Sequence, residues 1–87
     1  MYQSGNYNSL LNVTGHILKE YRIKNNLSLN TLSTKLSLLG IDIPKSSLHK
    51  IEKGTRVIRD YELAAFLVVL KIPADKIFED FIKKLVE

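Results

Sequence analysis

Apolar residues recur at helical spacing along most of the chain, and no segment has a convincing strand pattern. The first dozen residues are rich in Asn, Ser, Tyr and Gly and lack sustained periodicity. Residues 1–13 are therefore predicted to form a flexible N-terminal arm, while residues 14–87 suffice for one domain with a modest core. The pattern within that domain predicts five short helices and an all-α fold.

The first two helices are predicted from their caps and apolar stripes. Thr14 is the expected N-cap of the first helix, which should end near residue 25. Ser28 is the expected N-cap of the second helix, and Gly40 should end it. The predicted buried stripe of the second helix is Leu29, Leu32, Leu36 and Leu39.

The stretch DIPKSSLHKIEKG, residues 42–54, predicts a third helix with a narrow apolar face. Pro44 suits the helix start because its missing N–H would be unpaired there anyway, and Gly54 supplies a left-handed end. Only Leu48 and Ile51 form a buried seam. The residues left facing outward or sideways are Lys45, Ser46, His49, Lys50 and Lys53.

Two further helices complete the predicted bundle. The fourth should begin near Asp60, and its LAAFLVVL stretch is apolar nearly all round. Such a helix either lies at the centre of the bundle or packs one of its sides against another chain. The fifth should begin near Ala74, after Pro73. Its apolar residues either complete the core or form a symmetric homodimer interface with the fourth helix. The residues assigned to that interface are Phe78, Phe81, Ile82 and Leu85.

Composition excludes several kinds of site. The chain has no cysteine, and His16 and His49 are its two histidines, without a carboxylate cluster at ligand spacing, so no metal or other cofactor is expected. Ser47 and His49 lie two apart on a helix and point in different directions, so we expect no enzyme. No secretory signal or membrane-spanning run is apparent, which favours a cytoplasmic protein.

Positive charge gathers in the middle of the chain. The net charge is +4, and residues 27–59 hold six basic residues against two acidic ones. Residues 60–87 hold four lysines against six acidic residues. The basic middle suits a polyanionic partner, although a solvated helix face is the alternative interpretation of the lysines alone.

Several tracts together resemble the lambda-repressor-like helix-turn-helix domains of the Cro/C1 or XRE type. ILKEYRIKNNLSLNTLSTKL is similar to the first two helices of the family, and SSLHKIEKG is similar to its recognition helix. RVIRDYEL followed by LKIPADKIF resembles the segment that closes many such domains. The tract LLGIDIPKSSLHKIEKG is similar to a branch with a turn a couple of residues longer. The resemblance extends from roughly Gly15 to Phe78.

The resemblance implies a sequence-specific double-stranded DNA-binding transcriptional regulator of a prokaryote or phage, acting as a repressor. The residues expected at base edges are Lys45, Ser46, Ser47 and His49. Those expected at phosphates are Ser28, Lys50, Lys53, Arg56 and Arg59. Arg22 and Glu52 match positions where such domains tie the first helix to the recognition helix, so we expect a structural ion pair.

The chain also departs from the family pattern. Leu29 stands where many relatives have a glutamine that contacts phosphate, and Pro44 and Pro73 replace serine caps. These departures favour an alternative, a protein-interaction module such as an antitoxin or adaptor that uses the apolar fourth and fifth helices. Tyr2 and Tyr7 are further candidate contacts, to DNA or a partner, within the predicted arm.

Overall fold

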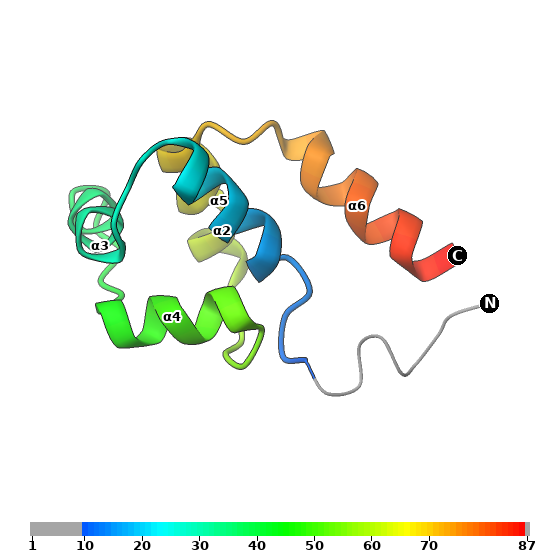
Figure 1. Ribbon diagram of the computed structural model, residues 1–87, viewed down its shortest axis with the longest axis horizontal. Helices are drawn as coiled ribbons and strands as arrows, with labels where there is room; N and C mark the ends of the chain where they lie inside the picture. Colours follow the sequence, from blue (N-terminus) through cyan, green and yellow to red (C-terminus); the bar gives the residue numbers. More distant parts are fainter. Residues whose placement is uncertain (1–9, 87) are drawn as a thin grey trace.

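The computed structural model describes residues 10–86, which fold as five α-helices (Figure 1). The helices are α2 Gly15–Lys24, α3 Leu29–Ser37, α4 Lys45–Lys53, α5 Asp60–Leu70 and α6 Ala74–Val86. The predicted all-helical fold is thereby confirmed for this range. The predicted arm at residues 1–9, with Tyr2 and Tyr7, lies outside it. Across residues 10–86, no helix is both long and apolar enough to cross a membrane.

The start of α2 is capped by Asn12 rather than by the side chain of Thr14. Thr14 precedes the helix but makes no side-chain capping bond. Instead, Asn12 Oδ1 accepts hydrogen bonds from the backbone N–H groups of Thr14 and Gly15, at 3.1 and 2.7 Å. The backbone N–H of Leu11 also donates to the carbonyl of Gly54 at 2.8 Å. Residues 10–13 are thus fixed against the domain, and the prediction of an arm reaching residue 13 was wrong for them.

Helix α3 begins as predicted and ends sooner. Ser28 Oγ accepts a hydrogen bond from the backbone N–H of Thr31 at 3.0 Å, which confirms the N-cap. The helix ends at Ser37, and Gly40 follows in the left-handed region with φ +83°. Leu39 is 50% exposed because it lies beyond the helix and no longer follows the stripe. Of the remaining stripe, Leu32 and Leu36 are buried and Leu29 packs partly buried against the core.

Helices α4 and α5 have the predicted limits. Pro44 occupies the N-cap of α4 and Gly54, with φ +80°, its C-cap. Backbone N–H of Arg59 donates to Glu62 Oε1 at 2.9 Å across the start of α5. Helix α5 ends at Leu70, where Lys71 turns the chain with φ +57°.

The core lies among α2, α3, α4 and α5, while α6 runs outward from it (Figure 1). Its buried apolar residues are Ile17, Leu18, Leu32, Leu36, Ile43, Leu48, Ile51, Ala65, Phe66, Leu70, Ile72 and Ile77. Among these, α6 contributes Ile77, whereas Phe78 and Ile82 are each 56% exposed. The interpretation of the fifth helix as the completion of the core is therefore wrong for Phe78 and Ile82, whereas Phe81 and Leu85 are half-buried.

Candidate nucleic-acid interface

A shielded ion pair fixes α4 against α2. Arg22 Nε donates to Glu52 Oε2 at 2.6 Å, and Arg22 Nη2 donates to Glu52 Oε1 at 3.1 Å. The two side chains are 13% and 5% exposed, and Arg22 Nη1 also donates to the carbonyl of Leu27 at 2.8 Å. The predicted pair is confirmed. Because a bidentate pair restricts the orientation of both side chains, it sets the position of α4 relative to α2.

Two polar side chains that the sequence did not single out hold the ends of α4. Ser33 Oγ, on α3, donates to the carbonyl of Ile43 at 2.7 Å, just before the helix. Asn12 Nδ2 donates to the carbonyls of Ile51 and Arg56, at 3.0 and 2.8 Å, at its other end. Both ends of α4 are therefore bonded to other segments of the domain.

A close backbone approach joins the start of α2 to the end of α4. A Cβ atom added at Gly15 would lie 2.0 Å from the carbonyl oxygen of Ile51. Beneath α4, Leu48 and Ile51 are both fully buried. Gly15 therefore permits a helix contact that no other residue allows without displacement.

The opposite side of α4 is an uninterrupted polar surface. At 100° per residue, its exposed residues fall within one arc centred opposite Leu48 and Ile51. They are Lys45, Ser46, His49, Lys50 and Lys53, called here the α4 face. Ser47 is half-buried and lies outside this arc. No lysine of the α4 face pairs with an acidic side chain within residues 10–86, so all three charges are available to a ligand.

The start of α3 offers a second hydroxyl besides that of Ser28. Ser28 Oγ donates to Thr31 Oγ1 at 2.9 Å while it accepts from the Thr31 backbone, so its proton is used in the cap. Thr31 is exposed, and its own hydroxyl proton has no acceptor in the described chain. Thr31 is thus better placed than Ser28 to donate to a phosphate, a difference that no sequence pattern indicates.

The structure corrects the expectation for Arg56. Arg56 Nη1 and Nη2 donate to the two carboxylate oxygens of Glu62 at 3.1 and 3.2 Å, and Nη1 also donates to the carbonyl of Val57. Its guanidinium is therefore occupied rather than free for phosphate. Arg59 is 64% exposed and lies 3.9 Å from Glu62, so it remains at the surface.

Glu62 is a buried carboxylate in the first turn of α5. It is 4% exposed and accepts from Arg56 and from the backbone of Arg59. The hydrogen bond from Arg56 lowers the pKa of Glu62, whereas burial acts in the opposite direction. The hydrogen bond from the Arg59 backbone and the positive charges of Arg56 and Arg59 lower it further, so the pKa lies below the ordinary value. Glu62 is therefore ionised at neutral pH and holds the loop after α4 to α5.

No family model, curated protein or solved structure matches the chain. The likeness to lambda-repressor-like domains accordingly rests on the sequence tracts quoted above. On the α4 face, three exposed lysines without an acidic partner in residues 10–86 lie on a helix that is held at both ends.

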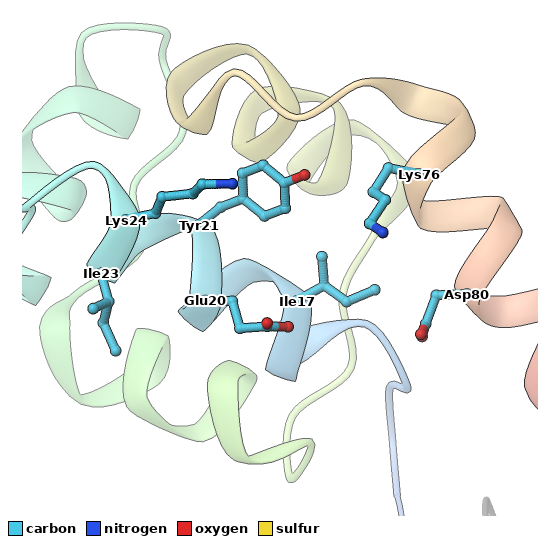
Figure 2. A pocket seen from close by; sticks show the side chains of 7 residues that line it. All are labelled: Ile17, Glu20, Tyr21, Ile23, Lys24, Lys76 and Asp80. Atoms are coloured by element: carbon cyan, nitrogen blue, oxygen red, sulfur yellow. The ribbon is translucent and has the colours of Figure 1, made fainter.

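A groove lies between α2 and α6, and Figure 2 shows the side chains that line it. Its volume is about 550 Å³, and it is lined by Ile17, Glu20, Tyr21, Ile23, Lys24, Lys76 and Asp80. Lys24 Nζ lies 5.1 Å from the centre of the Tyr21 ring. The groove mixes both signs of charge, unlike the α4 face. Within residues 10–86, no three His, Asp or Glu side chains are grouped as metal ligands.

Proposed function

We propose that the protein binds double-stranded DNA by placing α4 in the major groove, and that it is a cytoplasmic transcriptional repressor of a prokaryote or phage. The observation that carries this proposal is the α4 face, where three lysines, a histidine and a serine are exposed together. The major groove admits an α-helix, and unpaired lysines gain most from a polyanion. The bonds to Glu52, Ile43 and Ile51 keep the helix in one orientation.

We assign base contacts or phosphate contacts to the residues of the α4 face according to their position along the helix. Lys45, Ser46 and His49 lie nearer the helix start and are assigned to base edges. Lysine can donate to guanine O6 and N7, and serine can pair with several bases, so discrimination is moderate. Lys50 and Lys53 are assigned to phosphates, which add affinity but read no sequence. The predicted base contact of Ser47 becomes secondary because its side chain is half-buried.

The proposal includes the lambda-repressor-like helix-turn-helix fold. In support, α3 and α4 contact each other, and in Figure 1 α3 is seen nearly end-on whereas α4 lies across the view. The segment between them, residues 38–44, is tied to α3 through Ser33. Arg22 and Glu52 pair at the positions where such domains join the first and recognition helices.

The test compares two double variants with the same change in charge. Lys45→Glu with Lys50→Glu reverses two charges of the α4 face, and Lys19→Glu with Lys76→Glu reverses two exposed lysines elsewhere. Fluorescence anisotropy with a duplex pool of mixed sequence measures affinity across salt concentrations. We expect the first variant to lose binding by about 100-fold or more and to lower the salt slope by about one, for the lost phosphate contact of Lys50.

Equal losses in both variants would contradict the proposal, because net charge alone would then explain binding. Circular dichroism confirms that each variant is folded before its affinity is interpreted. If Lys45→Glu with Lys50→Glu preserves function in cells, the protein-interaction module that uses α5 and α6 becomes the better account.

A further inference from the structure

The groove between α2 and α6 has one acidic and one basic side chain on each of its two walls. The α2 wall holds Glu20 and Lys24, and the α6 wall holds Lys76 and Asp80. Because each pair is four residues apart, the two charges of a wall are separated by about 6 Å along the helix axis. Ile17, which is 4% exposed, lies between the charges in Figure 2 and forms an apolar floor.

Like charges meet at each end of the groove, because α2 and α6 run in opposite directions (Figure 1). His16 Nε2, in the first turn of α2, lies 3.5 Å from Asp80 Oδ2, in the middle of α6. In Figure 2 the ammonium groups of Lys24 and Lys76 lie toward one end of the groove. The carboxylates of Glu20 and Asp80 lie toward the other end. The groove therefore has a basic end and an acidic end.

Within residues 10–86, neither wall neutralises its own charges. Lys24 Nζ lies 5.1 Å from the centre of the Tyr21 ring and does not pair with Glu20. Lys76 and Glu20 have no ion-pair partner in this range. The Tyr21 hydroxyl, which points toward Lys76 in Figure 2, has no hydrogen-bond partner there either. The basic end thus offers three donor groups to an anion, and the acidic end offers two carboxylates to a cation.

We propose that this groove binds a small zwitterion of the dipeptide type, with its carboxylate at the basic end and its ammonium group at the acidic end. In an extended dipeptide the terminal nitrogen and the carboxylate carbon are about 6 Å apart, which matches the separation of the charges along each wall. An apolar side chain of the peptide packs on Ile17. In a free amino acid the two charged groups are only about 2.5 Å apart, so it cannot reach both ends.

A dipeptide in this position bridges two helices. At present Ile77 is buried against the core and Asp80 contacts His16, and the ligand adds a charged contact to α6 at each end of the groove. Binding should therefore strengthen the docking of α6 on α2. The groove shares no residue with the α4 face, so the proposal does not depend on DNA binding and is tested without DNA.

Proton–nitrogen correlation NMR of the full chain tests binding, with glycyl-leucine as the probe. We expect saturable shifts of amide signals in α2 and α6, with a Kd on the order of 1 mM, as is typical of a small ligand in an open site. Free leucine and N-acetyl-glycyl-leucine amide, which lacks both charges, should each bind about tenfold more weakly or worse. A wild-type chain without saturable shifts in α2 and α6 would overturn the proposal, as would equal binding of the capped peptide.

Exchange of the two charges on α6 tests the polarity of the groove. Lys76→Glu combined with Asp80→Lys leaves the net charge unchanged but places opposite charges across the groove at both ends. The two walls then pair with each other, so the affinity for glycyl-leucine should fall by about tenfold or more. An unchanged affinity would overturn the proposal.

Two single neutralisations decide the question if the exchanged chain fails to fold. Lys76→Gln removes one charge from the basic end. Lys19→Gln removes the same charge from the other side of α2, about 160° around the helix from Ile17. Lys76→Gln should weaken glycyl-leucine binding by about threefold or more, whereas Lys19→Gln should leave it unchanged. Equal affinities of these two variants would overturn the proposal, and circular dichroism verifies the helix content of each.

Discussion

Removal of the Arg22 guanidinium should cost the domain a large part of its stability. Glu52 is 5% exposed, and both of its oxygens accept hydrogen bonds from Arg22, at 2.6 and 3.1 Å. Arg22→Met keeps the apolar length of the side chain but deletes these donors and the one that reaches the carbonyl of Leu27. A shielded carboxylate and a backbone carbonyl then lose their partner.

The structure sets the size of this effect. Loss of one partner of a fully buried pair costs about 3–5 kcal/mol. Arg22 is 13% exposed, so water can reach the vacated site, and we expect about 2–3 kcal/mol for this variant. For a domain of this size, 1 kcal/mol shifts Tm by about 4–8 °C. The melting temperature should therefore fall by about 10–20 °C.

Urea denaturation followed by circular dichroism measures the free energy of unfolding of Arg22→Met, Glu52→Met and the double variant. The double variant should recover to within about 1 kcal/mol of the wild type, because no charge is then left buried alone. A cost below about 0.5 kcal/mol for Arg22→Met, typical of a surface change, would refute the reasoning. So would a double variant with a loss equal to the sum of the single losses.

Three further changes have defined outcomes. Gly15→Ala should cost about 2 kcal/mol or more in urea denaturation, because its Cβ would lie 2.0 Å from the backbone oxygen of Ile51; a cost near zero would contradict the contact. Asn12→Ala should cost about 1–2 kcal/mol in the same assay, since it removes bonds to Ile51 and Arg56 and the α2 cap; wild-type stability would argue against a fixed residue 12. Because the pKa of Glu62 is lowered on folding, its ionised form stabilises the protein above the ordinary value of 4.5, and this stabilisation is lost as the pH falls through the lowered pKa. The stability difference between wild type and Glu62→Gln, from urea titrations at a series of pH values, should therefore be largest at neutral pH and shrink in acid; a difference independent of pH would contradict it.

The sequence predicted those features that depend on neighbouring residues. The Ser28 cap and the left-handed Gly54 follow from local backbone chemistry, and both are present. The polar side of α4 follows from the three-residue spacing of Leu48 and Ile51, which fixes the buried side of a nine-residue helix. Local patterns sufficed for these because each depends on the conformation of one turn or one helix.

The failed predictions concern contacts between distant segments. Asn12 lies in a stretch whose composition is typical of an arm, yet its partners are 39 and 44 residues away. Arg56 was assigned to phosphate because its charge is visible in the sequence, whereas its bidentate bond to Glu62 depends on how the loop folds onto α5. The position of Leu39 in the sequence fits the helical period, but α3 ends at Ser37, two residues earlier. Periodicity does not specify tertiary partners, and it overstates the length of a helix.

The candidate site was predictable only in part for the same reason. The lysines of the α4 face were identified from charge and helical position alone. The hydroxyl of Thr31 replaces that of Ser28 as a candidate donor because of a hydrogen bond within the cap, which the sequence cannot display. Rigidity of α4 likewise arises from Ser33 and Asn12, two polar residues without a distinguishing pattern.

Selection from a random pool of duplex DNA at near-physiological salt tests the central claim most directly. The wild-type chain and the Lys45→Glu, Lys50→Glu double variant are used in parallel, and the retained DNA is sequenced. We predict an enriched motif for the wild type that is lost in the variant, because α4 supplies the base contacts. The same motif from both proteins, or no retention by the wild type, would contradict recognition of DNA by α4.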